Sequence, residues 1–335
     1  MARVPLTIVC DNYDRIQALR DGDVKVEGCD VTFVHLPPSS SFPRLMNNHE
    51  FPVSEMSLST YMLARSRRDL PYRAIPVAVS RVFAHCSIWI NADGRIKKPQ
   101  DLKGATVGMP NYHFTRGLSV KGVLKDEYGI GHTDMKYCFG GVDTAYDHAY
   151  MEFPPPAGVE AKMAERGKSL TDLLIEGKID AIVAARDPDV FLAGHPKVKR
   201  LFPDFRAVER ASFERTKVWP VMHLIGVRTD LIEKFPWLPV NLMNAFELAK
   251  QWAMPRLFEL DALTTSLPWL VAEAEDTVKL MGKNFWPYGV ESLKPTLEAQ
   301  TRWSYEQGIS ANKFAPEDLF IESTRKWRPV DAGRR

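Results

Sequence analysis

The chain has 335 residues, of which 45% are hydrophobic and 26% charged, a balance typical of a folded protein with one large domain or two smaller ones. Its 44 basic and 42 acidic side chains leave a net charge of +2, which gives no support for a nucleic-acid partner. No apolar stretch reaches the roughly 18–20 residues of a membrane span. Four well-separated cysteines indicate neither a disulfide framework nor a zinc site, so we expect a cytoplasmic protein with reduced thiols.

Short β-rich runs alternate with helical patterns over the first two thirds of the chain, which predicts an α/β protein with largely parallel strands. The predicted strands, including one strand-to-helix unit at 53–68, are 4–10, 31–37, 53–68, 75–91, 105–109, 179–185 and 219–230. Beyond residue 230 the apolar spacing is that of helices. These helices are predicted over 231–254, 267–281 and 292–307.

Two long β segments, 75–91 and 219–230, flank a compact α/β block of about 130 residues. A chain that leaves one lobe on one strand and returns on another encloses an inserted lobe. We therefore predict a first lobe made of 1–85 and 220–335 and a second lobe made of 86–219, joined by a two-strand hinge. Polar side chains on the crossing strands should converge in the cleft between the lobes.

Several short stretches occur in a characteristic order: D-x-x-D-R near the start, E-M-S-L-S-T-Y at 55–61, D-L-K-G before a strand, R-x-F-x-H, G-K-I-D-A and P-V-M-H. With them the chain resembles the 4,5-dihydroxyphthalate decarboxylase family from about residue 4 to about residue 310. That family is similar in fold to type II periplasmic solute-binding proteins, with two α/β lobes and a two-strand hinge, here followed by a helical C-terminal segment. The resemblance implies loss of CO2 from a small aromatic dicarboxylate, with no cofactor, because the ring serves as electron sink.

This chemistry needs an acid that protonates the ring carbon and an acceptor for a phenol proton. His85 and His223 are the candidates for the acid, because each is the polar exception in a predicted inter-lobe strand. A hydrogen-bonded structural histidine is the alternative for each of them, and His113 on a loop is a third option. Glu55 is the candidate acceptor, with a helix-capping segment as the alternative reading of its surroundings.

The remaining candidates would bind the substrate. Arg81 lies four residues before His85, so in an extended strand both side chains face the same way. Arg116 lies where a helix begins, so backbone N–H groups there could add to an anion site, and Arg186 ends a strand. For Arg81 and Arg186 the alternative is a structural ion pair. The other candidates, with capping or local packing as their alternatives, are Ser57, Ser59, Thr115, Tyr112, Asp11 and Tyr13.

No H-E-x-x-H motif, close histidine pair, glycine-rich phosphate loop or G-x-S-x-G motif is present, so the sequence indicates no metal site. The alternative function is a solute-binding protein that captures an aromatic acid for transport or sensing, against which we count the missing export signal and lipid-anchoring cysteine. Another enzyme on this fold, of menaquinone or pyrimidine-precursor metabolism, is a third option. Core packing or a homo-oligomer contact would use the C-terminal tryptophans Trp252, Trp269, Trp286 and Trp303.

Overall fold

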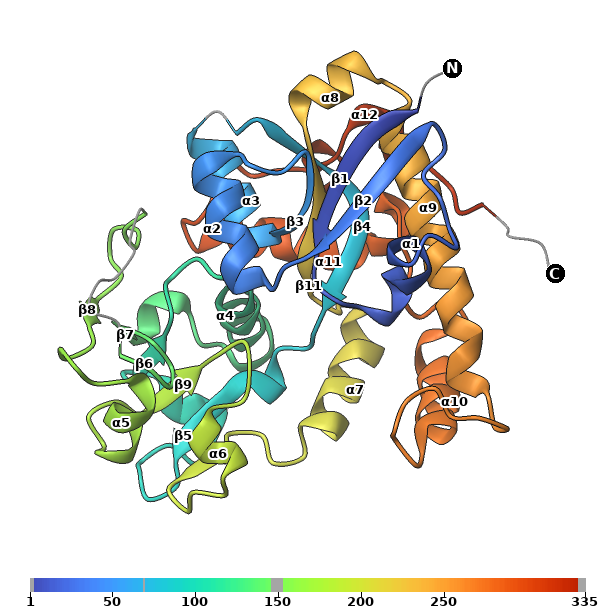
Figure 1. The fold of residues 1–335 in the computed structure, drawn as a ribbon. Coiled ribbons are helices and arrows are strands. Elements are labelled where there is room, and N and C mark those ends of the chain that lie inside the picture. Colours follow the sequence, from blue (N-terminus) through green and yellow to red (C-terminus); the bar gives the residue numbers. More distant parts are fainter. Residues whose placement is uncertain (1–2, 69, 146–152, 331–335) are drawn as a thin grey trace.

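The computed structural model describes residues 3–68, 70–145 and 153–330. Its strands form two separate sheets, one in the upper part and one at the lower left of Figure 1. The first sheet contains β1 (Val4–Cys10), β2 (Cys29–His35), β3 (Val53–Ser57), β4 (Tyr72–Arg81) and β11 (Val221–Arg228). The second sheet contains β5 (Ile88–Asn91), β6 (Thr106–Met109), β7 (Lys136–Phe139), β8 (Ala161–Met163), β9 (Ala181–Val183) and β10 (Val198–Arg200).

Helices cover the sheets and fill the C-terminal third. They are α1 (Gln17–Arg20), α2 (Pro38–Asn48), α3 (Leu58–Arg67), α4 (Thr115–Tyr128), α5 (Leu170–Ile175), α6 (Asp189–Leu192), α7 (Phe205–Thr216), α8 (Thr229–Lys234), α9 (Leu238–Ala253), α10 (Leu270–Met281), α11 (Val290–Glu306) and α12 (Glu322–Arg325). Short 3₁₀ turns are η1 (Asp14–Ile16), η2 (His85–Ser87), η3 (Pro99–Leu102), η4 (His132–Asp134), η5 (Met254–Phe258) and η6 (Pro316–Leu319). The predicted helix 231–254 is two helices, because Pro236 disfavours helical backbone in the residue before it.

The first sheet has the order β2-β1-β3-β11-β4. β1 runs parallel to β2 and β3, whereas β11 is antiparallel to both of its neighbours. The second sheet has the order β10-β5-β9-β6-β7-β8, with β5 antiparallel and β6 to β9 parallel. The prediction of an α/β fold is therefore confirmed, with one antiparallel strand inside each sheet, β11 in the first and β5 in the second.

The predicted continuous strand over 75–91 is wrong. β4 ends at Arg81, and η2 separates it from β5, which belongs to the other sheet. The chain crosses between the sheets here, after a last backbone hydrogen bond from the Val82 N–H to the Pro220 carbonyl at 3.1 Å. The second crossing lies between β10 and β11 and contains α7, drawn yellow in Figure 1. The lobe boundaries after 85 and before 220 stay a prediction.

α11 connects the first sheet to α4, the long helix that follows β6. Gln300 on α11 accepts from the Val221 N–H at 2.9 Å and donates to the Val221 carbonyl at 2.9 Å and the Ser119 hydroxyl at 3.3 Å. Trp303 packs against the backbone of α4 at Gly122, where any added Cβ would lie 2.1 Å from the indole. Because Gln300 bonds to both elements, α11 fixes α4 against the returning strand β11.

The four C-terminal tryptophans divide into two kinds. Trp303 is buried, and Trp286 donates from Nε1 to the Ala78 carbonyl at 2.8 Å. Trp252 and Trp269 are exposed, so core packing is not their use. A homo-oligomer contact through them stays a prediction. In the part of the chain that the structure describes, no helix is long and apolar enough to cross a membrane.

Candidate active site

A cavity of about 680 Å³ lies between the two sheets, a volume that suits a small-molecule ligand. Both lobes line it. The first-lobe wall comes from α2, the end of β3, β4 and β11, and the second-lobe wall comes mainly from the loop before α4 and the start of that helix. The polar lining residues are Ser39, Asn47, Ser57, Thr60, Ser80, Asn111, His113, Thr115, Arg116 and His223.

His223 reaches this cavity because of an irregularity in β11. On a regular strand consecutive side chains point to opposite faces, yet Met222 and His223 both line the cavity. The register of β11 against β4 shifts between Val221 and Ile225, and such a bulge redirects side chains, commonly beside active sites. On its other side His223 stands opposite Ser57 and diagonal to Glu55 in β3.

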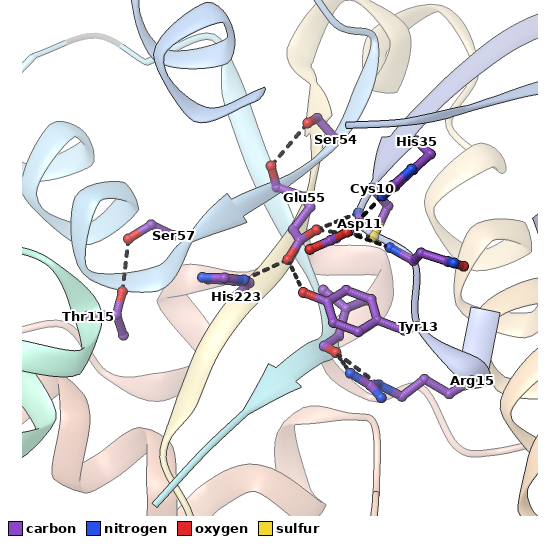
Figure 2. A network of polar contacts seen from close by, with 12 residues as sticks. Cys10, Asp11, Tyr13, Arg15, His35, Ser54, Glu55, Ser57, Thr115 and His223 are labelled. Atoms are coloured by element: carbon purple, nitrogen blue, oxygen red, sulfur yellow. Dashed lines mark hydrogen bonds and ion pairs between the residues drawn. The ribbon is translucent and has the colours of Figure 1, made fainter. Parts of the chain in front are cut away.

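Glu55 and His223 form a close pair. The His223 Nδ1 lies 2.6 Å from the Glu55 Oε1, and because an ionised carboxylate only accepts, the imidazole donates from this nitrogen. This arrangement leaves Nε2 for the cavity side, where His223 is partly exposed. Figure 2 shows the ring extending from Glu55 toward Ser57 and Thr115. The Phe42 ring of α2 meets the imidazole edge-on, with centroids 4.9 Å apart.

Glu55 is buried and accepts from four donors. Besides His223, the Tyr13 hydroxyl donates to Oε1 at 2.6 Å, while the Asp11 N–H at 2.8 Å and the Cys10 thiol at 3.3 Å donate to Oε2. Burial acts to raise the pKa of Glu55, but the bonds and charge of His223, with those of Tyr13 and Asp11, outweigh it and hold that pKa below its usual value. Glu55 is therefore a buried anion with its acceptor positions used.

The same environment keeps the neighbouring acids protonated. Burial, followed by the charge of Glu55, raises the pKa of the Tyr13 hydroxyl and of the Cys10 thiol. Both groups therefore remain donors to the carboxylate at neutral pH. Asp11 contributes its backbone N–H, while its own carboxylate contacts His35 at 2.9 Å. None of Glu55, Tyr13 and Asp11 lines the cavity, so the expected direct contacts of these residues with substrate are not supported.

Ser57 and Thr115 meet across the floor of the cavity. Their hydroxyls lie 2.8 Å apart, joining the end of β3 to the start of α4, as Figure 2 shows. Ser57 also caps α3 by accepting from the Thr60 N–H at 3.4 Å, so the capping alternative applies to Ser57 as well. Ser59 is fully buried outside the cavity and contributes its N–H to Thr115 at 3.2 Å. Two of these three predicted residues thus lie at the site.

Arg116 is the arginine of the cavity. Its guanidinium is buried, with Nη1 donating to the Ser87 hydroxyl at 2.5 Å and to the Phe83 carbonyl at 3.3 Å. The Nε has no hydrogen-bond partner, and no carboxylate of the described residues lies within 4 Å. Burial lowers the pKa of Arg116 from its very high usual value. The charges of Glu209 and Asp187 act on Arg116 from beyond ion-pair distance. A buried guanidinium with no carboxylate within 4 Å, at a cavity wall, suits an anionic ligand.

The other predicted arginines lie elsewhere. Arg81 donates to the Trp219 carbonyl at 2.8 and 3.2 Å and stacks over the Trp219 ring, and burial lowers its pKa to about 9. Arg186 has a 78% exposed side chain 3.8 Å from Asp143. Tyr112 is buried and donates to the Gln307 carbonyl at 3.2 Å. None of Arg81, Arg186 and Tyr112 lines the cavity, so the structure does not support the prediction that they contact the substrate there.

His85 also lies outside the cavity. It is 2% exposed in η2, with edge-on contacts to Phe202 at 5.1 Å and Tyr128 at 6.1 Å between ring centroids. Both ring nitrogens lack hydrogen-bond partners, and Nε2 is 3.8 Å from the Glu127 carboxylate. Burial, followed by the charge of Arg215, lowers its pKa to about 4. The expectation that His85 faces the ligand fails because β4 ends four residues earlier.

Helix α2 is the main contribution that the sequence analysis missed. Its lining residues are Pro38, Ser39, Phe42, Pro43, Met46 and Asn47. The sequence offers no motif there, because the helix follows an ordinary strand and its role depends on its position over the cavity. No group of three or more histidine, cysteine, aspartate or glutamate side chains in the described ranges could hold a metal ion.

No family model matches the sequence. The 4,5-dihydroxyphthalate decarboxylase of Comamonas testosteroni is 35% identical over 320 residues, covering 96% of this chain and 97% of that protein. The Pseudomonas putida protein of the same name is 34% identical over 204 residues, covering 61% of this chain and 79% of that protein.

Among solved structures, the periplasmic aliphatic sulphonate binding protein SsuA of Escherichia coli has a TM-score of 0.53 at 10% identity, covering 96% of this chain and 99% of that chain. The desulfurization enzyme DSZB has a TM-score of 0.51 at 13% identity, covering 95% and 96%. This fold thus carries both binding proteins and an enzyme, and fold alone does not decide function. The chain has the periplasmic-binding-protein fold and, by its sequence, belongs to the 4,5-dihydroxyphthalate decarboxylase family.

Proposed function

We propose that this protein releases CO2 from 4,5-dihydroxyphthalate and leaves 3,4-dihydroxybenzoate, by protonating the ring in the cavity between the lobes. The observation that carries the proposal is the pair of Glu55 and His223, in which a buried carboxylate holds an imidazole at the cavity wall. A protein that only captures an aromatic acid needs cations and hydroxyls but no acid beside the ring. The names of the two relatives supply the substrate.

Substrate binding uses the cationic and hydroxyl groups of the cavity. The substrate is a dianion at neutral pH. Arg116, which forms no ion pair within 4 Å in the described chain, binds the carboxylate that stays on the ring. The hydroxyls of Ser57 and Thr115 offer hydrogen bonds to polar groups of the ring. The apolar side chains of Phe42 and Met222, which line the same cavity as His223, solvate the departing carboxylate poorly.

The proton comes from His223. In its imidazolium form, the ring is stabilised through Nδ1 by Glu55, and Nε2 delivers the proton to the ring carbon that carries the departing carboxylate. Electrons from the hydroxyl para to that carbon fill the ring during protonation. The carbon–carboxylate bond then breaks, its electron pair restores aromaticity, and CO2 leaves. The balance is one proton taken up for each CO2 released, and solvent reprotonates His223.

Two features of this scheme reduce what the protein must supply. Because 4,5-dihydroxyphthalate has a mirror plane that exchanges its carboxylates, loss of either one gives the same product. Poor solvation of the departing carboxylate favours its conversion to neutral CO2, since charge disperses along the way. The protonated ring is itself the electron sink, so we propose that no cofactor takes part.

The test is to incubate the purified protein with 4,5-dihydroxyphthalate, a metal chelator and no added cofactor, and to follow CO2 and 3,4-dihydroxybenzoate. We expect turnover by the natural sequence. For His223→Ala we expect at least a roughly 10²-fold lower rate, the size of a lost general acid, with calorimetric substrate affinity changed only a few-fold.

A matched control is His195→Ala, because His195 lies outside the cavity and its ring accepts from the Lys197 N–H. We expect this variant to keep full activity. Substrate binding without any CO2 release by the natural sequence would reject the decarboxylase proposal in favour of a binding protein. Turnover by His223→Ala within a few-fold of the natural rate would reject His223 as the acid.

A further inference from the structure

The second-lobe wall of the cavity carries an imidazole that the scheme above does not use. His113 lies in the loop between β6 and α4 and lines the same cavity as His223. Its Nδ1 is buried and has no hydrogen-bond partner among the described residues. Buried polar groups without partners are rare in folded proteins, and each one calls for an explanation. A ligand in the cavity is the explanation that the position of His113 offers.

The loop that carries His113 is held at several points. The His113 N–H donates to the Asn111 side chain at 3.2 Å, and its ring meets Phe153 edge-on at 6.1 Å between centroids. Lys121 of α4 is fully buried, and its Nζ donates to the Tyr112 carbonyl at 2.7 Å. A buried lysine directed at this backbone carbonyl fixes the residue directly before His113. The imidazole is therefore positioned before any ligand arrives.

The two cavity histidines have different partners. His223 has the Glu55 carboxylate on one nitrogen, whereas no carboxylate of the described chain lies within 4 Å of His113. Burial, followed by the charge of Lys121, lowers the pKa of His113 to about 4. At neutral pH its ring is neutral, with one nitrogen able to accept a hydrogen bond. One histidine of the cavity is thus paired with a carboxylate, and the other is a neutral ring that can accept a hydrogen bond from a ligand.

We propose that His113 accepts the hydrogen bond of the ring hydroxyl para to the departing carboxylate and takes that proton while His223 protonates the ring. The inference rests on the proposed function and adds a second catalytic residue to it. The oxygen–hydrogen electron pair moves into the ring as the new carbon–hydrogen bond forms. After CO2 leaves, the proton returns from His113 to the phenol oxygen, so the net uptake of one proton is unchanged.

The test separates hydroxyl recognition from general binding by using two ligands. Phthalate has the carboxylates without the hydroxyls, and 4,5-dihydroxyphthalate has both. For His113→Ala we expect calorimetry to give about tenfold weaker binding of 4,5-dihydroxyphthalate, the size of one hydrogen bond to a well-placed acceptor. Phthalate affinity should change less than threefold, and the turnover rate should fall at least roughly 10²-fold.

A second variant distinguishes accepting a hydrogen bond from taking a proton. The amide of His113→Gln accepts a hydrogen bond but takes no proton, so we expect nearly natural affinity for 4,5-dihydroxyphthalate with a rate as low as that of His113→Ala. His132→Ala is the matched control, because His132 lies beyond the far end of α4 and outside the cavity. It should match the natural sequence in both assays.

The outcomes distinguish this inference from the function on which it rests. Equal weakening of both ligands in His113→Ala would make His113 a structural residue and overturn the inference. So would natural turnover in both His113 variants while the natural sequence releases CO2. If the natural sequence releases no CO2 but the ligand-selective loss is found, the proposed function fails, and with it the proton transfer to His113.

Discussion

Replacing Glu55 by glutamine tests the central pair most directly. The carboxylate accepts four hydrogen bonds, from His223 and Tyr13 on Oε1 and from Asp11 and Cys10 on Oε2. A glutamine amide has one oxygen and one NH2 group, so in either orientation one pair of donors faces another donor. Two of the four bonds are lost, and the negative charge opposite His223 disappears.

The expected magnitude follows from these contacts. A hydrogen bond to a charged group contributes about 1.5–3 kcal/mol, and a factor of ten in rate corresponds to about 1.4 kcal/mol. Loss of the charge-assisted bond to His223 should therefore slow CO2 release about 10- to 150-fold in single-turnover experiments at saturating 4,5-dihydroxyphthalate. Because Glu55 is fully buried, donors left without acceptors should also lower the free energy of unfolding by about 1–3 kcal/mol, measured by urea titration.

Tyr13→Phe is the matched control for Glu55→Gln. It removes one donor from the same Oε1 while the carboxylate keeps its charge and its bond to His223. We expect its rate to stay within about fivefold of the natural one, because Glu55 keeps its charge opposite His223 and Tyr13 acts on the imidazole only through this carboxylate. A Glu55→Gln protein that is folded, binds substrate and releases CO2 within threefold of the natural rate would refute the role assigned to this carboxylate.

Three further predictions concern other residues. Arg116→Lys should weaken 4,5-dihydroxyphthalate binding at least about tenfold by calorimetry, because lysine cannot bind a carboxylate in a bidentate way. Arg81 is equally buried but lies outside the cavity, so Arg81→Lys should change the affinity less than threefold. A larger loss of affinity in Arg81→Lys than in Arg116→Lys would assign carboxylate binding to Arg81 instead. Burial lowers the pKa of His85 in the folded protein to about 4, whereas an exposed histidine has a pKa of about 6.5, so the contribution of the neutral ring to stability is present above pH 6.5 and is lost as the pH falls toward 4. Between pH 7 and pH 5 the free energy of unfolding should therefore fall by about 2 kcal/mol less in His85→Phe than in the natural sequence. An equal fall in both proteins would show that His85 is not the source of this pH dependence. Gly122→Ala should destabilise the fold by about 1–3 kcal/mol because its Cβ would overlap Trp303, and an unaltered urea midpoint would show that α11 shifts freely.

The secondary structure was predictable where a single spacing of apolar residues extends over a whole strand or helix. The stretch 53–68 was predicted as a strand that turns into a helix, and the structure has β3 followed directly by α3. The stretch 75–91 was not predictable in this way, because apolar residues continue through the crossing between the sheets. Periodicity reports burial, and residues on both sides of the crossing, such as Ala78 and Ile88, are buried in the same hydrophobic cluster. The end of β4, and with it the true position of His85, depends on where the partner strands stop.

The site residues were predictable by type more than by role. His223, Arg116, Ser57 and Thr115 were candidates from their residue type and place along the chain, and the structure brings them to one cavity. Glu55 was a candidate for direct contact with substrate, but its oxygens face four donors of the protein. Those donors come from parts of the chain up to 168 residues away, and no local pattern indicates such partners.

The amino-acid sequence by itself determined the family and the α/β class, because these follow from residue order and from the spacing of apolar side chains. Only the tertiary structure decided which polar side chains share a cavity. A bulge in β11 turns His223 inward, α2 closes over it, and the crossing after β4 removes Arg81 and His85 from the site. The reason is that chemistry depends on distances of a few ångströms between groups far apart in the chain, and these distances are set by packing.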